Sequence, residues 1–153
     1  MNEMKILFTE EEVQQKVKEV ADKINLKFKD EDEILFICVL SGSFMFCADL
    51  MKHINIPCKV DFVKVASYEN SVTTGIIKEL YFNLPSLKDK NVILVEDIVD
   101  TGITAKYLVD KIKNEYHPKS VTFVSLFDKK CTRQIDIRPD IYGFDRDNKF
   151  ILG

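Results

Sequence analysis

Hydrophobic and polar positions along the first third of the chain predict a helix, a buried strand and a second helix. A capping box formed by Thr9 and Glu12 precedes apolar residues at helical spacing, which predict an amphipathic helix that ends before residues 27–33: Val13, Val17, Val20 and Ile24. Residues 34–40 (ILFICVL) are continuously apolar, as in a strand buried on both faces of a parallel sheet. The run stops at residues 41–43 (SGS), and a helical pattern follows over residues 44–53, which Ser43 is placed to cap.

The same alternation of strand and helix patterns continues to the end of the chain. A helix is predicted from Ile103 to Tyr116, where His117-Pro118 ends it. The polar residues 68–75 (YENSVTTG) predict a surface loop between two strands. Strand patterns cover five further segments: residues 59–67, 76–83, 92–95, 121–127 and 141–144. This order predicts one α/β domain whose central, mostly parallel sheet is flanked by helices and joined by right-handed crossovers.

Composition and charge narrow the class of protein. With 153 residues, 46% of them apolar, the chain suits a single domain with its own core. A net charge of -3 gives no basic field for nucleic acid, and no apolar run approaches the roughly 18 residues of a membrane span. We therefore expect a cytoplasmic protein that binds neither nucleic acid nor a membrane. The cysteines lack the spacing of a zinc site and are predicted to be reduced, mostly buried thiols: Cys38, Cys47, Cys58 and Cys131.

Two strand ends carry glycine turns that lead into helices, the place where open parallel sheets bind ligands. Gly42 and Gly102 stand at these turns, although each glycine taken alone is as well explained as a simple turn residue. Around Gly102, small hydroxyl and amide donors stand at a helix start, which suits a phosphate: Asp100, Thr101 and Thr104.

Adjacent carboxylates just before this turn narrow the kind of ligand. Glu96 and Asp97 would repel a phosphate unless a cation or sugar hydroxyls lie between them, so a ligand with a diol, a phosphate and Mg²⁺ fits the set. The alternative, that Glu96, Asp97 and Asp100 are solvated loop acids or helix caps, stays open at this point.

Residues 95–104 (VEDIVDTGIT) resemble the phosphoribosyl pyrophosphate (PRPP) signature of type I phosphoribosyltransferases: two acids, two apolar residues, Asp, Thr or Ser, Gly, any residue, Thr. The stretches VLSGSFMFCADL, VDFVKVASY, SLFDKK and PDIYGFDRDNKFILG occur in the order found in hypoxanthine-guanine phosphoribosyltransferases. The resemblance implies the type I phosphoribosyltransferase fold with a mobile lid hairpin. It also implies purine salvage, the Mg²⁺-dependent transfer of 5-phosphoribosyl from PRPP to hypoxanthine or guanine, giving IMP or GMP and pyrophosphate.

The resemblance assigns roles by position. Glu96 and Asp97 would hold the ribose diol and Mg²⁺, and Asp100 would be the general base near N7 of the purine. The 5′-phosphate would be bound by a loop of five residues: Asp100, Thr101, Gly102, Ile103 and Thr104. Pyrophosphate would lie on the turn formed by Leu40, Ser41, Gly42 and Ser43, and the lid would carry Ser67 and Tyr68. The base would be bound by Ile98, Lys129, Phe150 and Ile151, with Lys129 donating to the 6-oxo group and Phe150 stacking on the ring.

Each of these residues has a plainer explanation, and the chain departs from the family in two places. Lys129 and Lys130 could be a solvated charge pair, Phe150 a core aromatic and the Tyr68 loop an ordinary connection. Ser41 stands where many relatives have Lys or Arg. Relatives also continue beyond Gly153, so we expect the C-terminal end of the family domain to be missing from this single domain (1–153).

Other functions and the oligomeric state stay open at the level of sequence. The resemblance implies a homodimer or homotetramer. A PRPP- or nucleotide-sensing regulator and a receiver-like signalling domain remain as alternatives. The acidic composition disfavours the first, and the second leaves Gly102, Thr104, Lys129 and Phe150 unexplained.

Overall fold

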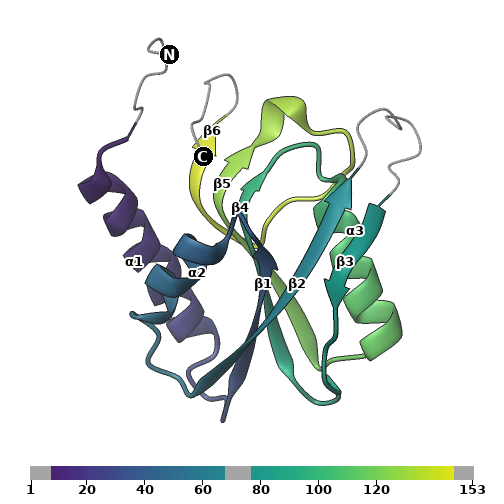
Figure 1. Cartoon of the computed structure of the whole chain (residues 1–153). Coiled ribbons are helices and arrows are strands. Elements are labelled where there is room, and N and C mark those ends of the chain that lie inside the picture. The colour runs from purple at the N-terminus through teal and green to yellow at the C-terminus, as the bar shows by residue number, and fades with distance from the viewer. Residues whose placement is uncertain (1–7, 68–76, 147–153) are drawn as a thin grey trace.

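The computed structural model describes residues 8–67 and 77–146, which form one six-stranded sheet with helices on both faces (Figure 1). The strands are β1 (Ile34–Leu40), β2 (Cys58–Ser67), β3 (Ile77–Phe82), β4 (Asn91–Val99), β5 (Ser120–Lys129) and β6 (Ile141–Arg146). Their spatial order is β3-β2-β1-β4-β5-β6, and every neighbouring pair is parallel except β2 with β3. The predicted mostly parallel α/β sheet is confirmed.

Helices α1 (Glu10–Lys27) and α2 (Phe44–Met51) cover one face of the sheet, and α3 (Ile103–Lys111) covers the other (Figure 1). The predicted capping box starts α1: the Glu12 amide donates to the Thr9 hydroxyl at 3.0 Å, and the Thr9 amide to the Glu12 carboxylate at 2.8 Å. A π-helical turn (Ile112–Tyr116) extends α3 and ends at His117 in the left-handed conformation, as the His117-Pro118 pair predicts. A short 3₁₀ turn (Lys130–Thr132) follows β5.

Strand β1 explains the continuous apolar run in the sequence, because its alternate side chains enter two separate cores. Ile34, Phe36 and Cys38 pack with α1 and α2, whereas Leu35, Ile37 and Val39 pack with α3. A strand in the middle of a sheet covered on both faces has no polar side, so apolar residues are required at every position.

Strand β4 is longer than the apolar pattern indicates. The sequence predicts a strand over residues 92–95, but the structure continues it to Val99, because Glu96, Ile98 and Val99 still pair with β5. Carboxylates at a strand end interrupt the hydrophobic pattern without interrupting the backbone ladder.

The turn after β1 differs from the prediction at Ser43. Ser43 occupies the cap position of α2, but its hydroxyl donates to the Val39 carbonyl at 2.6 Å and makes no cap bond. The capping role predicted for Ser43 is therefore wrong. The peptide bond between Leu40 and Ser41 is cis.

The prediction that all cysteines are reduced is also wrong. Cys38 on β1 and Cys47 on α2 form a disulfide, because α2 packs over the face of β1 that carries Cys38 and brings the two Cα atoms to 6.5 Å. Cys58 is half-buried and Cys131 is exposed, and both are free thiols.

Among the described residues, no helix combines the length and the apolar character needed to cross a bilayer.

Candidate active site

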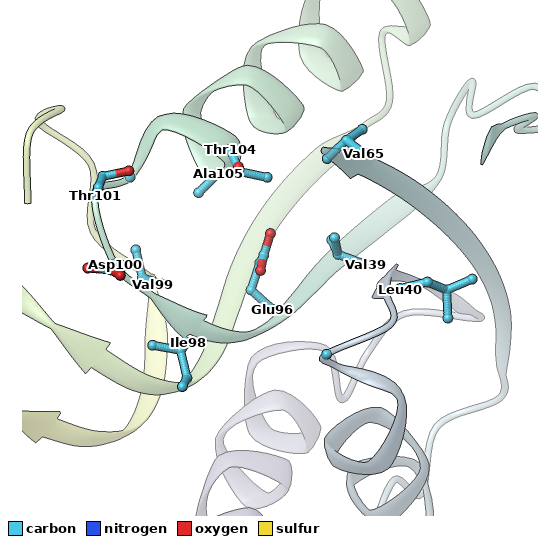
Figure 2. A pocket seen from close by; sticks show the side chains of 12 residues that line it. Val39, Leu40, Val65, Glu96, Ile98, Val99, Asp100, Thr101, Thr104 and Ala105 are labelled. Atoms are coloured by element: carbon cyan, nitrogen blue, oxygen red, sulfur yellow. The ribbon is translucent and has the colours of Figure 1, made fainter. Parts of the chain in front are cut away.

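The carboxyl ends of β1 and β4 lie side by side and form one wall of a cavity of about 240 Å³ (Figure 2). Parallel strands end at the same edge of the sheet, so the two glycine turns that the sequence picks out meet there. Site residues predicted from the sequence line this cavity: Leu40, Gly42, Glu96, Ile98, Asp100, Thr101, Gly102 and Thr104.

The loop of residues 100–104 has the shape of an anion cradle. Gly102 has φ 91°, a left-handed conformation, and a Cβ there would come 2.8 Å from the Ile137 side chain and 2.9 Å from that of Arg133. The Ile103 amide donates to the Thr101 hydroxyl at 3.2 Å. Within the described part of the chain, the amides of Thr104 and Ala105 at the start of α3 have no acceptor. Free amides at a helix N-terminus favour a phosphate.

Glu96 places a carboxylate inside the cavity. Its side chain lies in the middle of the lining residues, near Val39 and below Thr104 and Ala105 of α3 (Figure 2). One of its oxygens, Oε2, is buried and has no hydrogen-bond partner among the described residues. Burial, with a smaller contribution from the charge of Asp97, raises the pKa of Glu96 to about 8. A buried carboxyl without a donor favours a ligand that brings hydroxyls or a cation.

Asp97 does not line this cavity. Neighbouring side chains on a strand point to opposite faces, and a Cβ at Gly42 would lie 3.9 Å from the Cβ of Asp97. The structure therefore brings Asp97 next to the turn after β1 and separates it from Glu96. Burial raises the pKa of Asp97 to about 6.

Asp100 lies at the edge of the cavity. Its carboxylate is turned away from Glu96 (Figure 2) and accepts a hydrogen bond from the Thr132 hydroxyl. That hydroxyl is also within 3.2 Å of the Lys129 carbonyl, so the 3₁₀ turn after β5 fixes the position of the carboxylate.

In the turn after β1, Leu40 and Gly42 line the cavity, Ser41 is exposed and Ser43 is buried. The Ser43 amide and hydroxyl both point to the Val39 carbonyl, at 3.3 and 2.6 Å. Within the described residues the amides of Ser41 and Gly42 have no acceptor, so these two backbone donors are available to an anion.

The predicted base-binding residues are only partly described. Ile98 lines the cavity, and Lys129 is half-buried at the end of β5, outside the cavity lining. Lys130 forms an ion pair of 2.8 Å with Asp145, so the two lysines are not an equivalent solvated pair. Ser67 ends β2, whereas Tyr68, Phe150 and Ile151 lie outside the described residues.

The donor set fits the predicted Mg²⁺ only with help from the substrate. Among the described residues no group of three or more His, Cys, Asp or Glu side chains is gathered as in a metal site built by protein alone. Protein sites for Mg²⁺ often use one or two carboxylates together with substrate phosphates and water. The unpaired buried oxygen of Glu96, with Asp97 beside the turn after β1, fits that arrangement.

Three residues near the loop of residues 100–104 were not predicted from the sequence. Thr132 and Arg133 contact residues 99–100, and Asp128, at 0% exposure, pairs with Arg133. In the sequence they fall in a charged stretch, DKKCTRQIDIRPD, that carries no periodic pattern. The one local signal was Asp128, an acidic residue directly after the predicted strand over residues 121–127.

Comparisons with known proteins agree with the geometry. The model of the phosphoribosyl transferase domain matches residues 4–153. The chain is 38% identical over 150 residues to a hypoxanthine-guanine phosphoribosyltransferase of Bacillus subtilis, covering 97% of this chain and 82% of that protein.

Solved structures give the same result. A hypoxanthine-guanine phosphoribosyltransferase of Bacillus anthracis is similar with a TM-score of 0.89 and 40% identity, over 96% of this chain and 86% of that one. A hypoxanthine phosphoribosyltransferase variant of Trypanosoma cruzi in a ternary substrates complex is similar with a TM-score of 0.87 and 35% identity, over 97% and 84%.

The raised pKa of Glu96 predicts how stability depends on pH. Between its ordinary pKa of 4.5 and about 8, the folded protein keeps a proton that the unfolded chain loses, so the free energy of unfolding falls as pH rises. Glu96→Gln should reduce this fall by roughly 2 to 4 kcal/mol. Urea unfolding at pH 5, 6.5 and 8, without PRPP or Mg²⁺, measures the effect.

Asp97→Asn serves as the comparison, because it removes only the smaller cause of the Glu96 shift. Between pH 6 and 8, the free energy of unfolding of this variant should still decrease almost as much as that of the wild type. A Glu96→Gln protein with the wild-type pH dependence would contradict the assignment.

Proposed function

Since the chain belongs to the phosphoribosyl transferase family, we propose how its site performs the reaction of a purine-salvage enzyme of the hypoxanthine-guanine type. PRPP gives its 5-phosphoribosyl group to hypoxanthine or guanine, IMP or GMP forms, and pyrophosphate leaves. One observation carries the assignment of the substrate site: free amides of a glycine turn and an unpaired buried carboxylate face the same cavity.

The 5′-phosphate of PRPP binds the loop of residues 100–104. The free amides of Thr104 and Ala105 and the N-terminal end of the α3 dipole favour a dianion there. Gly102 is required because its left-handed conformation and its contact with Ile137 exclude a side chain.

The ribose and the pyrophosphate occupy the rest of the cavity. Glu96 accepts hydrogen bonds from the ribose hydroxyls, which gives its buried oxygen a partner. The amides of Ser41 and Gly42 bind the pyrophosphate, and the neighbouring Asp97 provides a carboxylate for Mg²⁺. When bound, Mg²⁺ supplies positive charge that stabilises the leaving pyrophosphate.

The chemical step breaks the bond from C1 of ribose to pyrophosphate, whose oxygen keeps the electron pair. Positive charge develops on the sugar, as in glycoside cleavage, and a nitrogen of the base forms the new bond to C1. Asp100 accepts the proton that the base loses at N7, and the Thr132 hydroxyl holds the carboxylate in place for this transfer. The lid, with Ser67 and Tyr68, excludes water from the reactive sugar.

Base recognition rests on Lys129, Ile98, Phe150 and Ile151. Lys129 has no ion pair among the described residues, so its ammonium is available to the 6-oxo group of the purine. A 6-amino group would leave that donor unpaired, which disfavours adenine. Cytoplasmic location and a homodimeric or homotetrameric state stay predictions.

The direct test is nucleotide formation from PRPP with hypoxanthine, guanine, xanthine and adenine, each with and without Mg²⁺. We expect turnover of 6-oxopurines that requires Mg²⁺ and little or none with adenine. PRPP binding without turnover of any base would reject the enzyme and favour the regulatory alternative.

Asp100→Asn removes the general base with little change of shape. We expect kcat to fall by about 10²- to 10⁴-fold, while the Kd for PRPP stays within about threefold. Steady-state kinetics and calorimetric titration with PRPP measure the two quantities. Asp110→Asn is the control: Asp110 lies on α3, pairs with Lys106 and is outside the cavity lining, so this variant should keep wild-type turnover. Equal losses of turnover and binding in Asp100→Asn would assign the residue to the phosphate site instead.

Lys129→Ala should lower the preference for hypoxanthine over adenine, measured as the ratio of kcat/KM, by about tenfold or more. Lys130→Ala is the matched control, because this neighbouring lysine pairs with Asp145 and should leave the ratio within about twofold. Unchanged selectivity in Lys129→Ala would remove Lys129 from base recognition.

A further inference from the structure

The segment that follows β5 holds three successive carbonyls of the loop after β4. The Arg133 side chain donates through Nη2 to the Val99 carbonyl at 3.3 Å and through Nε to the Asp100 carbonyl at 3.0 Å. The amides of Gln134 and Ile135 donate to the Thr101 carbonyl at 2.8 and 3.1 Å. Every carbonyl of residues 99–101 therefore faces residues 132–135, which we call the 132–135 segment.

This arrangement determines where the amides of the loop point. In a trans peptide the N–H group lies opposite the carbonyl, so the amides of residues 100–102 are directed away from the 132–135 segment. Carbonyls facing the cavity would repel a phosphate, whereas amides attract it. The donors of Arg133 thus favour the loop conformation that binds an anion.

Arg133 is itself held from two sides. Its Nη2 group pairs with the carboxylate of Asp128, which is completely buried, and its Nη1 group donates to the Ile137 carbonyl at 2.5 Å. The Arg133 side chain is only 12% exposed. A charge-assisted hydrogen bond to a buried carboxylate fixes the orientation of the Arg133 guanidinium.

Arg138 provides a natural comparison within the same structure. It approaches the other oxygen of Asp128 at 3.6 Å, but its side chain is 53% exposed and makes no hydrogen bond to residues 99–102 in the described part of the chain. The two arginines share one carboxylate, and only Arg133 connects it to the loop.

We propose that Arg133 is a positioning residue for PRPP binding: anchored on Asp128, it orients the carbonyls of Val99 and Asp100 so that the loop presents its amides to the 5′-phosphate. The proposal rests on the proposed function of the 100–104 loop. Arg133 acts through the loop and does not contact the substrate. A lysine cannot replace it, because a single ammonium lacks the planar fork that reaches several acceptors in fixed directions.

Arg133→Lys tests the role with the charge retained. We expect KM for PRPP to rise about tenfold or more, with KM for hypoxanthine within about twofold. Arg138→Lys is the matched control and should keep both values within twofold. A role in general stability alone would lower the yield of active enzyme and leave both KM values unchanged, and that result would overturn the proposal.

Amide hydrogen exchange of the peptide spanning residues 99–104 provides a readout that needs no turnover. Exchange should be faster in Arg133→Lys than in the wild type, and unchanged in Arg138→Lys. If the wild-type protein forms no nucleotide, the proposed function is rejected. If amide exchange is equal in all three proteins, the positioning role of Arg133 is rejected.

Asp128→Asn gives a second route if Arg133→Lys does not fold. The substitution weakens the anchor but keeps Arg133, so KM for PRPP should rise in the same direction by a smaller factor. A parallel rise of KM for PRPP and for hypoxanthine in the folded variant would contradict the proposal.

Discussion

The parallel pairing of β1 with β4 is the interaction on which the site depends. Its register, from Leu35 opposite Val92 to Cys38 opposite Val95, brings the carboxyl ends of two strands together although a helix and two strands separate them in the sequence. The glycine turn of each strand then opens toward the same cavity, at the start of α2 and of α3. Residues of both glycine turns line one cavity because of this single pairing.

The sequence allowed most of the fold to be predicted, because its signals are local. The capping box of α1, the apolar run of β1 and the turn at Gly102 each depend on residues within a few positions of one another. The predictions were wrong where contacts between elements distant in the sequence decide the end of a strand or a hydrogen-bond partner. Strand β4 continues past its apolar residues because β5 pairs with it, and Ser43 bonds to Val39 because the turn places that carbonyl within reach.

The site shows the same division between local and tertiary signals. The signature identified Glu96, Asp97 and Asp100, but their chemical difference arises from the fold: Glu96 is buried in the cavity, Asp97 faces the other turn, and Asp100 is held by Thr132. Arg133 was not predicted, because nothing in its neighbourhood in the sequence relates it to Val99 and Asp100. An unpaired buried carboxyl such as Glu96 costs stability in the absence of ligand, and proteins retain such groups where function requires them.

The hydrogen bonds from residues 132–135 to residues 99–101 also affect the order in which the protein matures during synthesis. A nascent chain contains the whole PRPP signature once Thr104 has been made, yet the donors that orient its loop are added about thirty residues later. Because the ribosome adds residues in sequence, β4 can be present before its loop has the shape that binds an anion. On the proposed role of Arg133, the loop therefore takes its anion-binding shape only after the segment that follows β5 has been added.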